Sequence, residues 1–321
     1  MKKYVIFLDI LGFTKYIETD PAAASQLLFD VSNLLNLQNN DNRFKGKISS
    51  KFLTTGFSDF LLSSDSVIAS SNDINIMLPQ LSKFLKSCIN ISIEDTSFSH
   101  YAIANSIYKS PVEMELKDID GKTRTVKNYP LLFRGGGYYG EFNSIKVNSL
   151  FQSNLMTTFN FYGNGFIKAY YIERSGFKGP RLMLSEDFYL AAEQRLKHLF
   201  LKQPNDNLYE FLWFYIIYIE GNEAGDEISK VNEYLPAAIR LWEHYNLEMR
   251  NEIDNEEKEK KKSVVIQYYE FICLIIKSTI THFHHIWKED GQHIAINYID
   301  NLIKDKEFYP EVKVLINETR V

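Results

Sequence analysis

The chain has 321 residues, of which 45% are hydrophobic and 14% are aromatic. A chain of this composition can bury a large apolar core, which excludes an intrinsically disordered protein, and its length favours one domain plus a second module. The formal net charge of −5 gives no overall basic surface, so we do not expect nucleic acid as the partner.

The cysteines and the apolar runs bear on the cellular compartment. Cys88 and Cys273 are far apart and lie among apolar residues, which favours buried free thiols in a reducing compartment over a disulfide framework. Asp9 interrupts the first apolar run and no small-residue cleavage site follows, which argues against a signal peptide. The most apolar stretch, 211–219, is about half of the roughly 20 residues that a spanning helix needs. The sequence therefore predicts a soluble, cytoplasmic protein without a membrane span.

The chain begins with a strand, a turn and a helix. Residues 4–10 are rich in strand formers and end before Gly12. The helix that follows begins with Asp20 as its N-cap and Pro21 at its first position, and its leucines recur on one face.

A hairpin is predicted next, over residues 47–65, with its turn near Thr55 and Gly56 and with Asp59 just after that turn. Further elements follow in the order expected of helices packed on a mostly antiparallel sheet, an α+β fold. These elements are a helix near 73–91, strands at 100–108 and 131–142, a hairpin around Asp120-Gly121, a largely helical stretch at 152–173, and a strand at 179–189 with Ser185 capping the next helix.

From about residue 187 the strand signals fade, and amphipathic helical patterns follow one another. We therefore predict two domains, a catalytic-sized one at 1–190 and a helical regulatory or dimerisation region at 191–321. The predicted helices of this second region lie at 186–201, 208–220, 234–250, 264–283 and 293–305.

Two acids at predicted strand ends are the first candidate site residues. Asp9 and Asp59 would repel each other if their strands are neighbours, unless a divalent cation lies between them, and carboxylate oxygens suit Mg²⁺ or Mn²⁺. The turn at 11–14 carries a glycine ahead of a helix, an arrangement that favours phosphate. A metal beside a phosphate site indicates a nucleotide, and two metal ions can activate phosphoryl transfer.

At these residues the sequence resembles the class III nucleotidyl cyclases. "FLDILGFT" at 7–14 is similar to the family's opening "FxDIxGFT", and "FSDFLLSS" is similar to its hairpin with the second metal aspartate, with Ser58 in the glycine place. "FRGGGYYGE" resembles its Arg-x-Gly-x-x-x-Gly strand through Arg134, and "FYGNGFIKAYYIE" resembles its "WGxxVNxAxRxE" helix. The resemblance covers about residues 4–190.

The resemblance implies a site and a reaction. Asp9, the backbone carbonyl of Ile10 and Asp59 would hold two divalent ions, Mn²⁺ or Mg²⁺. The ribose 3′-oxygen would attack the α-phosphate, giving a 3′,5′-cyclic nucleotide and pyrophosphate, in a head-to-tail homodimer. The triphosphate would be held by Leu11, Gly12, Phe13 and Thr14, with Arg134 among the nucleotide-binding residues.

The base-reading and transition-state positions depart from the family pattern. Thr55 and Asn160 stand where purine cyclases have charged or specific base-reading partners, which disfavours ATP and GTP. The family's transition-state asparagine and arginine fall on Ile167 and Tyr171. Arg174 would present a guanidinium on the same helical face, although an exposed helix-end arginine is an equally good reading.

Taken together, these motifs look most like the pyrimidine cyclases of the Pycsar antiphage system. That resemblance implies conversion of UTP, or else CTP, to a cyclic nucleotide that activates a separate effector protein. Three alternatives stay open: a degenerate cyclase domain that binds nucleotide as a regulator, a purine cyclase, and a scaffold whose acids are structural. His282, His284 and His285 lack the spacing of shared metal ligands, so no metal is predicted there.

Overall fold

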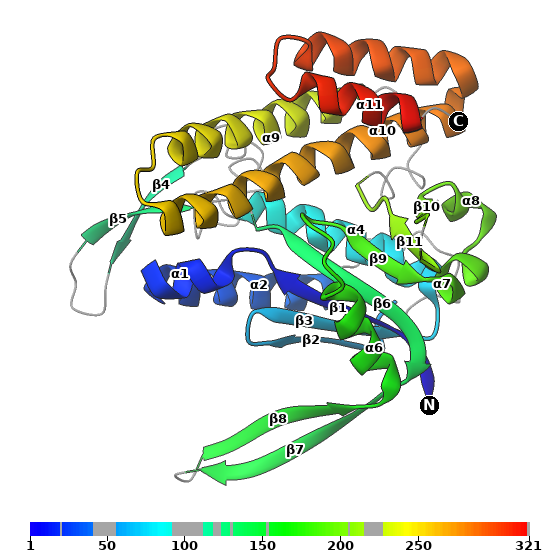
Figure 1. Ribbon diagram of the computed structural model, residues 1–321. Coiled ribbons are helices and arrows are strands. Elements are labelled where there is room, and N and C mark those ends of the chain that lie inside the picture. Colours follow the sequence, from blue (N-terminus) through cyan, green and yellow to red (C-terminus); the bar gives the residue numbers. More distant parts are fainter. Residues whose placement is uncertain are drawn as a thin grey trace.

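The computed structural model describes residues 1–19, 21–40, 56–91, 112–117, 123–128, 131–151, 154–204, 206–214 and 227–319. A seven-stranded sheet forms its centre, and long C-terminal helices lie along one side of it (Figure 1). The strands of this sheet are β1 (Lys2–Ile10), β2 (Asp59–Ser63), β3 (Ser66–Ser71), β6 (Phe133–Glu141), β9 (Leu182–Ser185), β10 (Phe200–Lys202) and β11 (Leu208–Phe211).

The sheet has the strand order β10-β11-β9-β6-β1-β3-β2. Among the described strands of this sheet, the β6–β9 pair is parallel, and the other neighbours run antiparallel. The predicted α+β fold with a mostly antiparallel sheet is therefore confirmed. The helices around this sheet are α1 (Phe13–Thr19), α2 (Pro21–Asn40), α4 (Ile74–Ile91), α6 (Asn164–Glu173), α7 (Glu186–Ala191) and α8 (Gln194–Lys197).

β1 separates the two faces of the sheet by strict alternation. Ile6, Leu8 and Ile10 join the large core that includes residues of α2 and α4, whereas Val5 and Phe7 pack beneath α6. α6 lies directly on β6, since a Cβ at Gly136 would be 2.2 Å from the carbonyl oxygen of Ala169. Asp9 follows the same alternation and therefore lies on the α6 face.

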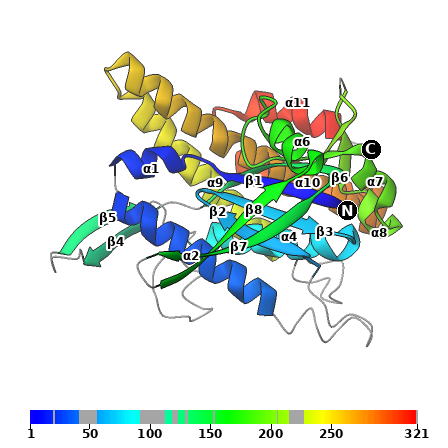
Figure 2. The same cartoon turned by 90° about the horizontal axis from the view of Figure 1, so that it is seen from below.

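Three predicted helical stretches contain strands. The stretch 152–173 was expected to be helical, but its first part is β8 (Asn154–Tyr162), which pairs with β7 (Asn143–Phe151) in a long hairpin that projects from the sheet (Figures 1 and 2). The predicted helix at 186–201 contains α7 and α8 but ends in β10, and the predicted helix at 208–220 begins as β11; these two strands pair beside β9. Short apolar runs fit a buried strand as well as a helix, which explains these errors.

Other expectations are confirmed. α4 matches the helix near 73–91, and β4 (Val112–Lys117) pairs with β5 (Thr123–Asn128), as expected of the strands on either side of Asp120-Gly121, which themselves lie outside the described residues. Cys88 and Cys273 are buried free thiols. Asp20, Thr55 and the strand expected at 100–108 lie outside the described residues.

The C-terminal region is helical from residue 227 onward, as predicted. It consists of α9 (Glu227–Arg250), α10 (Asn255–Ile303), which is interrupted at Lys288, and α11 (Tyr309–Thr319). The core of the sheet continues without a break into these helices, because one cluster of buried residues contains Leu8, Phe211 and Ile275. A division into two domains near residue 190 stays a prediction.

In the part of the chain that the structure describes, α10 is long and apolar enough to cross a membrane by length and composition. Its most apolar window has a mean hydropathy of 1.4, and 72% of that window is buried inside the molecule. Core helices of soluble proteins satisfy the same test, so this helix is weak support for a membrane span.

Candidate carboxylate site at the end of β1

Asp9 lies at the end of β1, between two strands that place polar side chains beside it. It is in register with Ser66 of β3 and with Arg134 of β6. Residues directly opposite one another on paired strands point to the same face of a sheet, so the three side chains share the α6 face. The Ser66 hydroxyl donates to Asp9 Oδ1 at 3.4 Å.

The charge of Asp9 is poorly compensated. Burial, followed by the negative charges of Glu173 and Asp65, raises the pKa of Asp9 to about 6, against the opposing effects of Arg134 and the Ser66 hydrogen bond. The raised pKa means that the surroundings of Asp9 disfavour its ionised form. A cation bound beside Asp9 would stabilise that form, so the site favours binding of a cation.

Asp65 is brought to Asp9 by the β2–β3 turn. Ser63 pairs with Ser66, which leaves a two-residue loop of Ser64 and Asp65. Ser64 has a φ of 58°, the conformation required at the first central position of a tight hairpin turn. The Ile10 N–H donates to the Asp65 carbonyl at 3.1 Å, so the turn is tied to the end of β1.

The predicted pairing of Asp9 with Asp59 is wrong. Asp59 is in register with Ser70, and Ser70 is opposite Val5, four residues before Asp9, which is about 13 Å along the strand. Its carboxylate accepts from Lys3 Nζ at 2.8 Å, and from the hydroxyls of Ser70 and Ser144 at 2.5 and 2.6 Å. Burial alone would raise its pKa, but these donors lower it.

Asp65 is the residue that sequence reasoning missed. The polar run Ser63–Ser66 separates two apolar runs and is typical of a hairpin turn, so a signal was present. Asp59 was chosen because it follows a serine in the place of the family glycine. Ser64 precedes Asp65 in the same manner and carries the positive φ that would suit a glycine.

Arg134 lies beside Asp9 but is engaged by α6. Its Nε and Nη2 lie 2.6 and 2.5 Å from Glu173 Oε1, and Nη1 donates to the Phe177 carbonyl at 3.4 Å. The Glu173 side chain is only 1% exposed. Because this ion pair holds the guanidinium, Arg134 acts in the structure as a link between β6 and α6. Its expected contact with a nucleotide stays a prediction.

The turn after β1 has the backbone shape that the sequence suggested. Gly12 is exposed with a φ of 78°, and the Leu11 N–H donates to the Leu132 carbonyl at 2.8 Å. Phe13 is 2% exposed, so its side chain belongs to the core, whereas Thr14 is exposed. Any contact of Phe13 with a phosphate would therefore use its backbone.

The other predicted site residues lie on or near α6. Ile167 and Tyr171 are 49% and 64% exposed on its outer surface. Arg174 is the C-cap residue of α6, and its guanidinium lies 4.8 Å from the ring centroid of Tyr170. Asn160 is exposed on β8, opposite Ile145. Of these residues, Arg174 directly follows Glu173, whose side chain pairs with Arg134 beside Asp9.

A cavity of about 500 Å³ lies beside the outer surface of α6 and is separate from the carboxylate site. Its lining combines aromatic residues with acids, and it includes neither Asp9 nor Asp65. Residues of its wall are Tyr138, Lys168, Tyr171, Ser185, Asp187 and Asp206.

The donors at the end of β1 fit a hard divalent cation in their chemistry. Asp9 and Asp65 supply carboxylate oxygens and Ile10 supplies a carbonyl, and oxygen ligands are those that Mg²⁺ and Mn²⁺ prefer. Within the described residues no group of three or more His, Cys, Asp or Glu has metal-binding geometry. An ion here would therefore share its coordination with water or with a ligand's phosphate oxygens.

The histidines of α10 do not form a metal site in the described chain. The ring of His285 stacks on that of His198, with centroids 3.7 Å apart and planes 3° apart. Burial, followed by His285 and His282, lowers the pKa of His198 to about 3. Stacked neutral imidazoles are a packing contact between α8 and α10.

No family model and no curated protein matches the chain. Similar solved structures include two of adenylate cyclases from Trypanosoma brucei in their monomeric state. One has 12% identity and a TM-score of 0.38, covering 66% of this chain and 90% of its own. The other has 11% identity and a TM-score of 0.39, covering 66% of this chain and 88% of its own. With both TM-scores below 0.5, these similarities carry no argument about what this chain does.

Proposed function

We propose that the chain is a nucleotidyl cyclase that converts UTP, or else CTP, to a 3′,5′-cyclic nucleotide and pyrophosphate. The observation that carries this proposal is the meeting of Asp9 and Asp65 at the end of β1, next to the open turn at Gly12. The resemblance of residues 7–14 to the opening motif of class III cyclases supplies the reaction class, with Asp65 taking the part that the sequence assigned to Asp59.

The reaction balances without a further reactant. The 3′-oxygen forms a bond to the α-phosphorus, the bond from that phosphorus to the bridging oxygen breaks, and pyrophosphate leaves while the 3′-hydroxyl proton passes to solvent. Divalent ions, when bound, would neutralise phosphate charge and favour the 3′-alkoxide. Asp9 and Asp65 would hold them, and the poorly compensated charge of Asp9 favours that binding.

The preference for a pyrimidine rests on the neutral residues Thr55 and Asn160 at the base-reading positions. A homodimer, a cytoplasmic location, and a separate effector activated in antiphage defence belong to the same proposal through the Pycsar resemblance. Tyr171 stands where the family has its transition-state arginine, and Arg174 would supply the cation instead.

A second candidate function is a cyclase-like domain that binds nucleotide without turning it over. It is favoured by Ile167 and Tyr171, which are exposed apolar or neutral side chains where the resemblance implies asparagine and arginine. Its signature is metal-dependent binding of a nucleotide with no cyclic product.

The test uses three matched aspartate variants, Asp9→Asn, Asp65→Asn and Asp59→Asn. Each is incubated with ATP, GTP, CTP or UTP and Mn²⁺, and cyclic product and pyrophosphate are quantified. We expect turnover of a pyrimidine nucleotide by the wild type, a loss of at least about 100-fold in the first two variants, and retained turnover in folded Asp59→Asn.

Two results would contradict parts of this proposal. Absence of product from all four nucleotides would remove the cyclase and leave the binding domain. Loss of turnover in Asp59→Asn together with normal turnover in Asp65→Asn would return the metal role to Asp59 and reject the assignment made from the strand register.

A further inference from the structure

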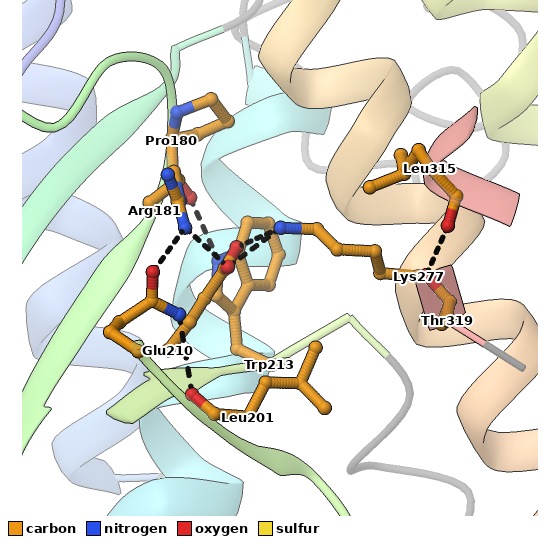
Figure 3. A network of polar contacts seen from close by, with 9 residues as sticks. Pro180, Arg181, Leu201, Glu210, Trp213, Lys277, Leu315 and Thr319 are labelled. Carbon is orange, nitrogen blue, oxygen red and sulfur yellow. Dashed lines mark hydrogen bonds and ion pairs between the residues drawn. The ribbon is translucent and has the colours of Figure 1, made fainter. Parts of the chain in front are cut away.

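A buried charge network joins α10 to β11 and to the residue before β9 (Figure 3). Glu210 of β11 is 1% exposed and accepts from Lys277 Nζ of α10 at 2.6 Å through both carboxylate oxygens. Arg181 Nη2 donates to Glu210 at 2.6 Å and to Gln203 at 3.2 Å. Burial alone would raise the pKa of Glu210, but Lys277 and Arg181 lower it. Glu210 is therefore held as a carboxylate between two basic side chains.

Arg181 is also attached to the strand that carries Arg134. Its backbone carbonyl accepts from the N–H of Gly135, the residue after Arg134, at 2.9 Å. Its guanidinium lies 5.3 Å from the ring centroid of Phe177, and the Phe177 carbonyl accepts from Arg134 Nη1 at 3.4 Å. Arg181 thus holds the surroundings of Arg134 both through the backbone and through a side chain.

The segment between α6 and β9, residues 174–181, has no helix or strand of its own. Its position consequently depends on contacts with its neighbours, among them those at its two ends and the hydrogen bond from Trp213 Nε1 to the Pro180 carbonyl at 3.1 Å. One end is the pair of Arg134 with Glu173, and the other end is Arg181 in the Glu210 network. Arg134 in turn lies opposite Asp9.

We infer that Lys277 is a positioning residue for the carboxylate site. Through Glu210 and Arg181 it fixes the segment that holds Arg134 beside Asp9, and so couples the helical region to the site. This inference rests on the proposed function only where it names a divalent cation as the ligand. The contacts themselves run from α10 to Arg134 of β6, which lies opposite Asp9 in the register of β6 with β1.

The test compares Lys277→Met with Lys261→Met. Lys261 also lies on α10, but its ion pair with Glu252, at 2.7 Å, does not involve the sheet. Two quantities are measured: hydrogen exchange of the backbone amides at residues 8–11, and the affinity for Mn²⁺ by calorimetry without nucleotide. In Lys277→Met we expect faster exchange and about three- to tenfold weaker Mn²⁺ binding, with neither change in Lys261→Met.

Two further variants separate positioning from a loss of folding. Lys277→Arg retains the charge and should restore Mn²⁺ affinity to within about twofold. Lys277→Gln, whose amide still donates to Glu210, should show the same changes at smaller size, and it serves if Lys277→Met does not fold. In a Phe177→Leu background the effect of Lys277→Met should shrink, because the path to Arg134 is already weakened.

The outcomes are distinct. Equal Mn²⁺ affinity and equal exchange in Lys277→Met and Lys261→Met would overturn the inference and leave the proposed function standing. Effects of Lys277→Met and Phe177→Leu that add without coupling would also overturn it. A wild type that binds no Mn²⁺ without nucleotide would overturn this inference, whereas the proposed function is removed only by the absence of cyclic product.

Discussion

Two carboxylates of the same sheet, the buried Glu210 and the half-buried Asp9, have opposite electrostatic surroundings. Glu210, on β11, faces two cations, Arg181 and Lys277, which hold its pKa below the ordinary value against the effect of burial. Asp9, on β1, is raised to a pKa of about 6 by burial and by Glu173 and Asp65, while the nearest cation is shared with Glu173. The charge of Glu210 is compensated by cations of the protein itself. The charge of Asp9 is poorly compensated, and a bound cation would compensate it.

Removing the charge of Glu210 should have the largest effect on stability. Glu210→Gln leaves Arg181 and Lys277 buried without their counter-charge, so we expect a loss of about 3–5 kcal/mol in the free energy of unfolding. Urea denaturation at pH 7 measures it. The matched control is Glu243→Gln, which breaks the exposed pair with Lys306 and should cost less than about 1 kcal/mol.

Equal losses in the two variants would contradict the view that Glu210 is an essential counter-charge. Glu270 lies close enough to Arg181 and Lys277 to interact with both, although burial, the largest influence on it, raises its pKa. If Glu270 compensates in the Glu210→Gln variant, the loss should increase further in a double substitution with Glu270→Gln.

Removing the charge of Asp9 should change the free energy of unfolding in the opposite direction. Asp9→Asn keeps the shape and eliminates a carboxylate that is disfavoured in the folded state, so the metal-free variant should be more stable than the wild type at pH 8. We expect a gain of about 1–2 kcal/mol, which allows for solvent screening of a partly exposed group. Millimolar Mn²⁺ should stabilise the wild type but not the variant.

The pH dependence of this gain provides its control. The folded pKa of Asp9, about 6, lies above the value of an unfolded aspartate, so its penalty is complete above pH 6 and is relieved as the pH falls toward 4. The advantage of Asp9→Asn should therefore shrink between pH 8 and pH 4.5 in urea denaturation without metal. A constant difference across this range would show that Asp9 is not the titrating group.

The same two regions show what the sequence can and cannot predict. β1, its turn and the candidate role of Asp9 follow from a local pattern of strand formers, one acid and a glycine. The partner of Asp9 does not, because strand register is a long-range property: Asp59 and Asp65 both follow a serine, and only the pairing of β3 with β1 decides between them. Glu210 was placed on a helix because the apolar run around it has no clear period.

Substitutions in the turn that holds Asp65 should have the smallest effect on stability. Ser64 has a φ of 58°, which a residue with a Cβ adopts at a cost, so Ser64→Gly should raise the free energy of unfolding by about 0.5–1 kcal/mol. Ser63→Gly, at the end of β2 where the backbone is extended, should instead lower it by a similar amount. Because the hydrogen bond from Ile10 to the Asp65 carbonyl remains in both variants, Mn²⁺ affinity should stay within about twofold. A Ser64→Gly protein that is less stable than the wild type, or that binds Mn²⁺ far more weakly, would mean that the serine side chain itself supports the site.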